Sequence, residues 1–454
     1  MFIGSLSKLL GGSNLLDRRS HEPRATPSYM CSQPKAACGE HQQTPKGESG
    51  VHGKMKVLNV VGARPNFVKI APILRAFEAV NARPEIGRVE SLLVHTEQHY
   101  DDAMSAAFFT DLQIQPSHYT LGVGSGSHAV QTAEVMRRFE PVVMEERPDV
   151  VLVVGDVNST AACALTAAKL GVRVAHVEAG LRSFDRSMPE EINRIVTDAL
   201  SDFLFTTESS ANENLQREGH PPEKVFFVGN VMIDSLLACR RMAERSTILE
   251  RMGLTPKRYG ADYALVTLHR PSNVDAVEPL AAILDALAQL SWELPVVLPV
   301  HPRTRARLQE FKLTHYVDPL VLNGTPVVIR PGRISLFEPV GYLDFLRLMS
   351  AARVVLTDSG GIQDETTCLG VPCLTLRENT ERPVTMTSGT STLVGTDRDR
   401  ILSGARGALD NGRSALTLPP MWDGHAAERI VDVLVEKVTG DVPRQAFYHT
   451  AGSE

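Results

Sequence analysis

The sequence feature that most constrains the fold is an alternation of apolar runs and helical stretches that occurs twice along the chain. The first series begins at Lys56 and ends near Val228, and the second runs from Tyr263 to about Asp410. Alternating strands and helices are typical of parallel, doubly wound sheets. The sequence therefore predicts an α/β protein with two Rossmann-like domains.

The apolar runs and the periodic segments between them give the expected elements. Strands are expected at residues 57–61, 91–95, 150–154, 172–177, 203–206, 225–228, 263–267, 296–300, 327–329, 354–356 and 373–376. Helices are expected at residues 67–80, 277–290, 303–311, 342–350, 360–369 and 398–410.

The domain boundaries follow from where these patterns start and stop. Residues 1–54 are rich in Ser, Gly, Pro, Gln, Lys and His without periodicity, so we expect a disordered extension, serving either as an alternative start or as a regulatory tail. The domains are expected at 55–230 and 231–424, with a helix over 232–252 between the two strand series. A final amphipathic helix at 425–440 is expected to pack back on the first domain, followed by a tail at 441–454.

Composition and net charge limit which partners and which cellular compartment are expected. The net charge of −6 over 454 residues, without a basic stripe, argues against nucleic acid as a partner. No apolar run approaches the roughly 20 residues that span a bilayer, so no membrane association is expected. The six cysteines contain no CxxC pair, which argues against a zinc site and a disulfide framework. We expect a cytoplasmic protein with no bound metal.

A binding site for a nucleotide sugar is predicted at residues 356–382, LTDSGGIQDETTCLGVPCLTLRENTER. Ser359, Gly360 and Gly361 form a turn at a helix start, where exposed N–H groups and the helix dipole favour a phosphate or diphosphate. Glu365 follows about one and a half turns later and is expected to face sugar hydroxyls. An ordinary strand, turn and helix with Gly for packing is the alternative for so short a motif. The ENTERP cluster, which contains Arg382 after the next strand, favours a binding site for a nucleotide sugar.

Two cations lie near the start of the first expected helix. The turn GARPNFVK places Arg64 and Lys69 at the carboxyl edge of the first strand. Cations at a helix N-terminus oppose the helix dipole, so an anionic ligand is the expected reason for them. For Lys69 alone, an ordinary surface position is the default interpretation.

Three carboxylates are expected near one another in the first domain. Asp156 follows a buried strand in VVGDVNST, Glu178 follows the next in HVEAGLRS, and Glu190 begins a helix in SMPEEINR. Clustered carboxylates raise one another's pKa, which suits residues that exchange protons near neutral pH. Helix capping is the alternative for Asp156, and a structural role is favoured for Glu191. The cluster indicates proton transfer at carbon.

Two histidines follow consecutive strands of the second series. His269 and Arg270 occur in TLHRPSN, and His301 occurs in PVHP. A single histidine is most often structural, but two at one sheet edge indicate that at least one meets phosphate or substrate.

Seven ordered motifs carry a resemblance to a known family: GARPNFVKIAP, GDVNST, HVEAGLRS, PEEINR, TLHRPSNVD, TDSGGIQDE and ENTERP. As a set they resemble the non-hydrolysing UDP-N-acetylglucosamine 2-epimerases, over residues 55 to about 438. The resemblance implies a GT-B arrangement with the active site in the interdomain cleft. It also implies interconversion of UDP-N-acetylglucosamine and UDP-N-acetylmannosamine for cell-surface polysaccharide synthesis. The implied route eliminates UDP to give 2-acetamidoglucal and then adds UDP back, with no cofactor.

The resemblance also implies roles for individual residues. Asp156, Glu178 and Glu190 match catalytic carboxylates, with the direction of each proton transfer left open. The matches to substrate-binding positions are Arg64, His269, Ser359 and Gly360 for the diphosphate, Glu365 for the ribose, and Lys69 and Arg382 for further cleft contacts. One departure concerns regulation. Many bacterial members read HRRE where Pro271 follows Arg270 here, while Gln98 and His99 resemble part of an allosteric pocket, so activation by UDP-N-acetylglucosamine stays open.

Several other functions fit part of the pattern. A GT-B glycosyltransferase would share the nucleotide-sugar site but would need an acceptor. A hydrolysing epimerase would release free N-acetylmannosamine. A sensor would bind the nucleotide sugar without turnover. A diacetamido uronic acid sugar is an alternative substrate, although ENTERP favours the plain N-acetylhexosamine. We expect a homodimer.

Overall fold

The computed structural model describes residues 54–83, 88–97, 109–254, 263–321, 329–412 and 417–440. All of them belong to one compact unit, Val51–Glu454. The expected N-terminal extension up to residue 53, the tail at 441–454, and Gln98 and His99 lie outside the described residues.

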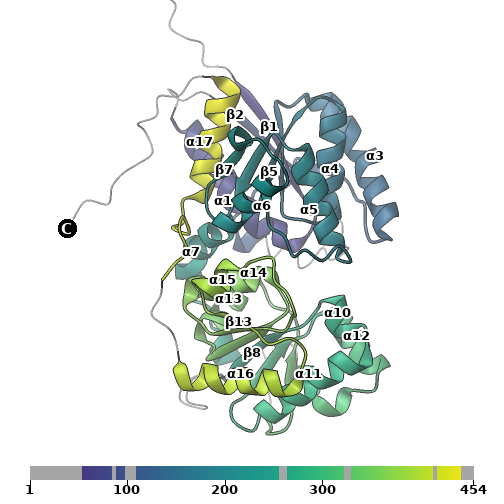
Figure 1. The fold of residues 1–454 in the computed structure, drawn as a ribbon, viewed down its shortest axis with the longest axis vertical. Coiled ribbons are helices and arrows are strands. Elements are labelled where there is room, and N and C mark those ends of the chain that lie inside the picture. Colours follow the sequence, from purple (N-terminus) through teal and green to yellow (C-terminus); the bar gives the residue numbers. More distant parts are fainter. Residues whose placement is uncertain are drawn as a thin grey trace, which may run out of the picture. The chain divides into compact units, whose positions relative to one another are not determined.

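The first half of the described chain forms a parallel sheet of seven strands in the order β3-β2-β1-β4-β5-β6-β7. Figure 1 labels β1, β2, β5 and β7 of this sheet. The strands are β1 (Met55–Val61), β2 (Val89–His95), β3 (Tyr119–Thr120), β4 (Val150–Val154), β5 (Arg173–Val177), β6 (Phe203–Thr206) and β7 (Val225–Phe227). Every residue of β4 (VVLVV) is buried, as expected for a central strand covered on both faces.

Helices cover both faces of this first sheet. They are α1 (Arg64–Asn81), α3 (His128–Glu146), α4 (Asn158–Lys169), α5 (Pro189–Leu200), α6 (Ser209–Arg217), α7 (Val231–Ala243) and the short 3-10 helix η1 (Pro222–Lys224). The next helix, α8 (Ile248–Arg251), packs against α13 (Tyr342–Ala351) of the second half. Helices α3, α4 and α5 pack side by side, and α1 packs against α7. Local signals set the starts: the Ser127 side chain caps α3, and the Asn230 side chain caps α7.

The second half forms a parallel sheet of six strands in the order β10-β9-β8-β11-β12-β13. Its strands are β8 (Ala264–Thr267), β9 (Val296–Pro299), β10 (Ser335–Phe337), β11 (Val354–Thr357), β12 (Cys373–Thr375) and β13 (Ser391–Leu393). Its helices are α10 (Pro271–Val274), α11 (Val277–Leu290), α12 (Pro302–Glu310), η2 (Thr314–Tyr316), α13 (Tyr342–Ala351), α14 (Gly360–Leu369), α15 (Val384–Thr387) and α16 (Arg398–Asn411).

Both sheets therefore have the strand order of a doubly wound Rossmann fold, which confirms the predicted fold class. In each sheet the order reverses beside the first strand, between β1 and β4 and between β8 and β11. Ligands of doubly wound sheets bind outside the carboxyl ends of the strands at such a reversal point. The fold thus brings the residues that follow β1, β4, β8 and β11 to the positions where a ligand is expected.

Helix α7 joins the hydrophobic cores of the two halves. It packs against α1 of the first half and against α13 and α14 of the second. One cluster of buried apolar side chains runs from β1 through α7 to β11, and it includes Val57, Ile233, Leu236, Met349 and Val355. Burial of apolar surface is the main stabilising term in such a junction.

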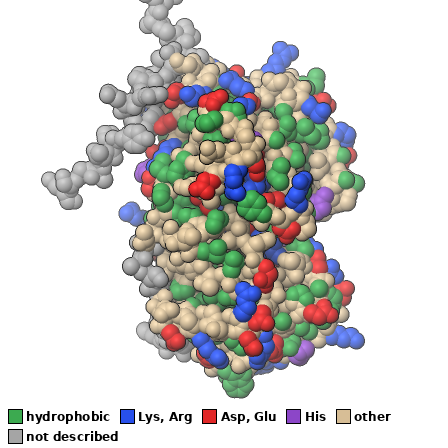
Figure 2. Space-filling view, in the orientation of Figure 1, with side chains coloured by type: hydrophobic (Ala, Val, Ile, Leu, Met, Phe, Trp, Pro, Cys, Tyr) green, Lys and Arg blue, Asp and Glu red, His purple; other side chains and the backbone are tan. Residues whose placement is uncertain are grey.

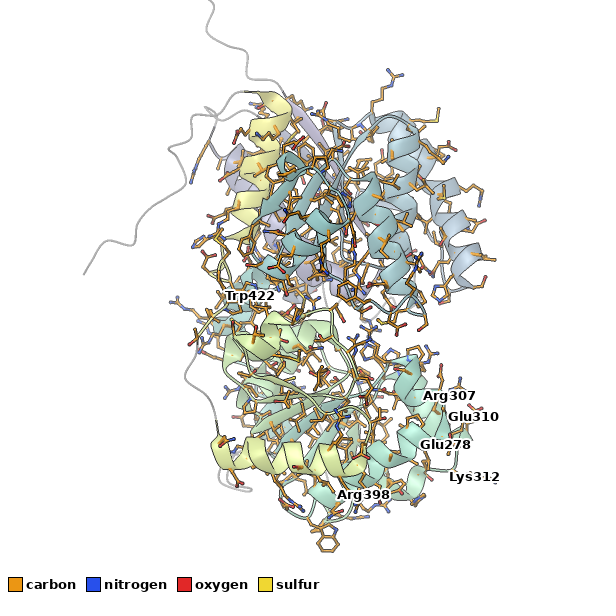
Figure 3. The ribbon with its side chains drawn as sticks, in the orientation of Figure 1. Glu278, Arg307, Glu310, Lys312, Arg398 and Trp422 are labelled. Carbon is orange, nitrogen blue, oxygen red and sulfur yellow. The ribbon has the colours of Figure 1, made fainter. Side chains whose placement is uncertain are left out.

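The chain returns to the first half through residues 417–425, and the last described helix, α17 (Ala426–Thr439), packs against α1 and β1. The indole of Trp422, labelled in Figure 3, is buried and donates from Nε1 to the Thr207 carbonyl at 2.9 Å. Gly229 has a φ of 93°, and a Cβ there would lie 2.0 Å from the Met421 carbonyl oxygen, so only glycine fits this crossing.

Four details differ from the sequence predictions. Strands β3 and β13 were not predicted, because runs of two or three residues carry little periodicity. The edge strand expected at 327–329 is instead β10, and of the expected residues only Ile329 is described. The helix expected over 232–252 is instead two helices, α7 and α8, and the Ser246 hydroxyl between them accepts the Ile248 N–H.

Candidate active site

The predicted site residues follow the carboxyl ends of parallel strands in both sheets. Arg64 follows β1, Asp156 follows β4 and Glu178 follows β5. In the second sheet His269 follows β8, Ser359 follows β11 and Arg382 follows β12. Ion pairs connect the residues that follow the first sheet with those that follow the second.

Glu178 lies between two cations, one from each half of the chain. Its side chain is 3% exposed and pairs with the Lys69 ammonium on one oxygen and with the Arg382 guanidinium at 3.4 Å on the other. Lys69 is itself buried, so its interpretation as an ordinary surface lysine is wrong, and the anion next to it is Glu178. A contact of Lys69 with an anionic ligand stays a prediction. Glu178 also has a φ of 74°, which is uncommon for a residue with a side chain and holds the carboxylate at the strand end.

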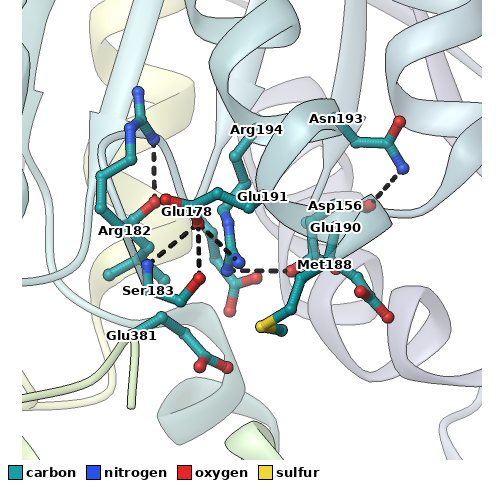
Figure 4. A network of polar contacts seen from close by, with 12 residues as sticks. Asp156, Glu178, Arg182, Ser183, Met188, Glu190, Glu191, Asn193, Arg194 and Glu381 are labelled. Atoms are coloured by element: carbon teal, nitrogen blue, oxygen red, sulfur yellow. Dashed lines mark hydrogen bonds and ion pairs between the residues drawn. The ribbon is translucent and has the colours of Figure 1, made fainter. Parts of the chain in front are cut away.

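Asp156 pairs with a buried arginine of α5. Its Oδ2 lies 3.3 Å from Nη1 of Arg194, and its backbone carbonyl accepts the Asn193 amide at 2.9 Å. Figure 4 shows Arg194 between Asp156 and Glu191. Val157, rather than Asp156, is the N-cap residue of α4, so the helix-capping alternative is wrong.

The electrostatics of Asp156 differ from the prediction. Burial raises the pKa of Asp156, but the charges of Arg194 and Lys69 lower it more, so the pKa lies below the ordinary value. The prediction that clustering would raise this pKa is therefore wrong. The reason is that arginine and lysine side chains stand between the carboxylates.

Glu190 is the most exposed of the three carboxylates. Its side chain is 37% exposed and lies 3.7 Å from Nη1 of Arg270, which itself lies 3.8 Å from Glu381. Asp156, Glu178 and Glu190 are thus each held by a cation, and two of these cations come from the second half of the chain.

Glu381 is a buried anion at the centre of several arginines. It pairs with Arg377 at 2.8 Å. Burial raises the pKa of Glu381, but the charges of Arg377, Arg194, Arg382 and Arg270 pull it well below the ordinary range. Sequence reasoning named Glu381 within ENTERP but did not select it as a site residue, and it did not select Arg194 or Arg377.

Arg382 is fixed from both sides. Asp364, fully buried on α14, lies 2.6 Å from Nη1 of Arg382, while Nη2 faces Glu178. Burial lowers the pKa of Arg382, but its carboxylate neighbours raise it above the ordinary value, so this side chain stays charged.

His269 sits on the edge of the second sheet against a buried aspartate. Its Nδ1 lies 2.7 Å from Oδ1 of Asp358, and the imidazole is 40% exposed. The His301 ring lies 5.9 Å away. Burial, the His269 ring and the charge of Arg64 lower the pKa of His301 to about 4, so His301 is neutral at pH 7. Because the charge of Arg64 affects His301, the N-terminus of α1 lies near these two histidines.

The turn before α14 has the small residues that close approach requires. Ser359 is the N-cap residue, and its side chain makes no capping hydrogen bond. A Cβ at Gly360 would lie 2.5 Å from Oε1 of Glu381, and one at Gly361 would lie 2.8 Å from the Met232 methyl group. A side chain at either position would therefore require the Glu381 carboxylate or the Met232 methyl group to move.

Glu365 lies deeper than the other predicted ligands. It is 4% exposed, and Oε1 accepts the Tyr342 hydroxyl at 2.9 Å. Burial raises the pKa of Glu365 to about 7. The predicted contact of this carboxylate with a ribose stays a prediction.

A second polar network lies behind the first sheet edge. His176 contacts Asp198 at 2.6 Å through Nδ1 and the Gly155 carbonyl at 2.8 Å through Nε2, and Arg182 pairs with Asp198 at 2.7 Å. Glu191 accepts the backbone N–H groups of Ser183 and Phe184 at 2.9 Å each, which supports its structural interpretation.

The described residues contain neither a cluster of metal ligands nor a membrane-spanning helix. No His, Cys, Asp or Glu side chains among them gather in threes as a metal ion requires. No helix in the described ranges is long and apolar enough to cross a bilayer. Figure 2 shows acidic and basic side chains interspersed over one face.

Comparison with known proteins defines the class first. The crystal structure of the UDP-GlcNAc 2-epimerase of Methanocaldococcus jannaschii, in complex with UDP-GlcNAc and UDP, matches 84% of this chain and 99% of its own at a TM-score of 0.74 and 40% identity. With the two Rossmann-like sheets, this similarity defines a GT-B-type α/β protein.

The family follows from the sequence comparisons. The family model described as UDP-N-acetylglucosamine 2-epimerase matches residues 80–435. The M. jannaschii UDP-N-acetylglucosamine 2-epimerase is 41% identical over 382 residues, covering 84% of this chain and 99% of the relative. The UDP-2,3-diacetamido-2,3-dideoxy-D-glucuronate 2-epimerase of Pseudomonas aeruginosa is 39% identical over 386 residues, covering 84% and 100%. The chain belongs to the UDP-N-acetylglucosamine 2-epimerase family.

Proposed function

We propose that this protein interconverts UDP-N-acetylglucosamine and UDP-N-acetylmannosamine by a non-hydrolysing route. The observation that carries the proposal is the set of ion pairs that joins Asp156, Glu178 and Glu190 to cations at the edges of both sheets. Carboxylates next to cations are the groups that a reaction with proton transfer and a departing diphosphate requires. Family membership supports the same conclusion.

The proposed reaction balances without water. One carboxylate takes the proton from C2 of the hexose, the electrons of the C–H bond form the C1=C2 double bond, and the C1–O bond to UDP breaks. The products of this step are 2-acetamidoglucal and UDP. The UDP oxygen then bonds to C1 again while a second acid delivers a proton to the other face of C2. UDP must therefore be held in place between the two steps.

We assign proton transfer to Asp156, Glu178 and Glu190 as a set. Asp156 has a lowered pKa and is therefore ionised at neutral pH, which suits a proton acceptor. Glu178 is buried between Lys69 and Arg382, so movement of either cation toward a phosphate would change its surroundings. Which carboxylate serves which face of the sugar is left open.

We assign retention of UDP to residues of both sheets. The α14 N-terminus, with Ser359, Gly360 and Gly361, offers N–H groups to the diphosphate. Arg64, Lys69, His269 and Arg382 offer positive charge or N–H donors, and Glu365 is assigned to the ribose. These side chains stabilise charge that develops on the leaving diphosphate, which is the largest catalytic term in many enzymes.

Product analysis by NMR tests the proposal. With UDP-N-acetylglucosamine as the sole substrate, we expect UDP-N-acetylmannosamine to appear until equilibrium is reached, with little free UDP. Stoichiometric free N-acetylmannosamine and UDP would instead identify a hydrolysing enzyme. UDP binding without any turnover would support the sensor, and a requirement for an acceptor sugar would support a glycosyltransferase.

A second substrate is favoured by one comparison. The P. aeruginosa relative, whose name gives UDP-2,3-diacetamido-2,3-dideoxy-D-glucuronate as its substrate, is matched over its full length at 39% identity. The ratio of kcat/KM for the two sugars decides between them. We expect the plain N-acetylhexosamine to have the higher value, and the reverse ratio would reassign the substrate.

The biological setting is also proposed. We infer a cytoplasmic homodimer that supplies UDP-N-acetylmannosamine for cell-surface polysaccharide synthesis. The proposal is supported by the nucleotide-sugar chemistry of the family, and the mass of the protein in solution, measured by light scattering, tests the assembly.

A further inference from the structure

We propose that Asp358 is a positioning residue that keeps a proton on Nδ1 of His269, so that the ring can bind an anionic ligand as an imidazolium that donates its second proton, on Nε2, to that ligand. The inference rests on the proposed function only for the identity of that ligand, the diphosphate of a UDP sugar. The geometry of the pair stands on the structure alone.

Asp358 is fixed by donors on one of its two oxygens. The side chain is fully buried, and Oδ2 accepts the backbone N–H groups of His269 and Arg270 at 2.9 Å each and the Asn273 amide at 3.3 Å. Asn273 is itself held by the Leu376 carbonyl at 2.8 Å. With Oδ2 occupied in this way, Oδ1 is the oxygen that faces His269, at 2.7 Å from Nδ1.

The contact defines which ring nitrogen carries the proton. Burial raises the pKa of Asp358, but His269 and the two backbone N–H groups lower it more, so the carboxyl group is ionised and can only accept. Because Nδ1 of His269 lies 2.7 Å from this carboxylate, we assign a proton to Nδ1. Nε2 is then the remaining polar atom of a ring that is 40% exposed.

The neighbouring histidine is held in the opposite way. Nδ1 of His301 accepts the backbone N–H of Arg303 at 3.2 Å, so in the neutral ring the proton is on Nε2. His301 is neutral at pH 7, as shown above. Of these two rings, His269 is the one whose Nδ1 faces a carboxylate.

Replacement of Asp358 by asparagine gives a selective test because the three donors decide how the amide is oriented. They require an oxygen at the Oδ2 position, which turns the amide NH₂ toward Nδ1 of His269. Two donors cannot face each other, so Nδ1 must lose its proton and the ring cannot carry a charge. A hydrogen bond between charged groups contributes about 1.5–3 kcal/mol, so UDP affinity should fall about tenfold or more.

The experiment combines a spectroscopic and a binding measurement on the full chain. In protein labelled with 15N-histidine, we expect the wild-type Nδ1 of His269 to show the shift of a protonated nitrogen and that of Asp358→Asn to show the shift of an unprotonated one. Titration calorimetry with UDP should show the loss of affinity. Asp318→Asn is the matched control, because Asp318 is also buried and paired with arginines, Arg330 and Arg333, outside the proposed site.

A double-mutant cycle separates positioning from a general structural role. If Asp358 acts through His269, the double variant Asp358→Asn/His269→Gln binds UDP as weakly as His269→Gln and no weaker. Additive losses would overturn the inference. An unprotonated Nδ1 in the wild-type protein would overturn it without any variant, including the case in which Asp358→Asn does not fold. A protein that shows the expected tautomer but neither binds UDP nor turns over would contradict the proposed function and leave the positioning intact.

Discussion

Among the described residues, two buried aspartates each contact a histidine, and the two pairs differ in what the second ring nitrogen of the histidine meets. In the first half, His176 is fully buried between Asp198 and the Gly155 carbonyl, so both nitrogens are satisfied within the protein. In the second half, His269 has Asp358 behind it and a ring that is 40% exposed. The difference indicates that a histidine–aspartate pair is structural when it is closed and available for ligand binding when one side is open.

The same comparison explains the carboxylates. Asp198 and Asp358 are buried next to cations or N–H donors, which lower their pKa despite burial. Glu365 is also buried, but its hydrogen-bond partner is the neutral Tyr342 hydroxyl, and burial raises the pKa of Glu365 to about 7. Asp364 shows that one positive neighbour is not always enough, because burial raises the pKa of Asp364 to about 7 although the Arg382 guanidinium lies 2.6 Å away. The balance between burial and all nearby charges and donors decides whether a buried carboxyl group stays ionised.

The largest expected effect comes from breaking the closed pair. Asp198→Ala leaves the buried Arg182 guanidinium without one of its carboxylate partners, and removal of one partner of a buried ion pair typically costs about 3–5 kcal/mol. We expect a loss of that order in the free energy of unfolding, measured with urea. Glu244→Ala, which removes an exposed pair with Arg240, should cost less than about 1 kcal/mol. Equal losses in the two variants would refute the distinction.

Replacing the histidine of the open pair should change the activity of the protein rather than its stability. His269→Gln should lower kcat about 100-fold, because a donor to the leaving diphosphate is lost, while the free energy of unfolding changes by less than about 1 kcal/mol. His176→Gln is the matched variant and should show the reverse: a clear loss of stability, because its ring is enclosed. A destabilised His269→Gln with normal kcat would contradict the comparison.

A smaller effect should appear in the pH dependence of stability. Because the native pKa of Glu365 is raised to about 7, the folded state binds a proton more tightly than the unfolded state, whose carboxyl pKa is about 4.3. This group's contribution to stability is therefore present at low pH and is lost as the pH rises through 7. Between pH 5.5 and 8 the loss is about 2 kcal/mol.

Glu365→Gln removes this titration. Urea unfolding of the wild-type protein and the variant without UDP should therefore give curves that converge at low pH and separate as the pH rises, with the variant more stable at pH 8. A pH-independent difference between the two proteins would show that Glu365 is ionised in the native state throughout this range.

Much of the fold could be predicted from the sequence because it depends on local patterns. The buried run of β4 and the periodic helix α17 are readable within about a dozen residues. Strands β3 and β13 were missed because their pairing comes from neighbouring strands and not from their own few residues. Likewise, the break between α7 and α8 was missed, and the Ser246 side chain beside it contacts Asp344 of α13, far away in the sequence.

The site was predictable in its residue types but not in its pairing. Position after a buried strand identified Asp156, Glu178 and His269. The partners Arg194, Asp358 and Asp364 were not selected, because contacts such as Asp364 with Arg382 form only when the turns of the folded chain meet. The raised pKa predicted for clustered carboxylates failed for Asp156 for the same reason, since Arg194 stands beside it. The spacing of Asp358 and Asp364 around the Gly pair was the available signal.

The central claim is that the C2–H bond of the sugar breaks and forms again while UDP stays bound. Incubation with UDP-N-acetylglucosamine in deuterated water, followed by NMR and mass spectrometry of the nucleotide sugars, tests it most directly. The account predicts one deuterium at C2 of UDP-N-acetylmannosamine and, at equilibrium, at C2 of UDP-N-acetylglucosamine, without an acceptor. Formation of UDP-N-acetylmannosamine with its C2 hydrogen fully retained, or the recovery of unlabelled substrate alone, would contradict it.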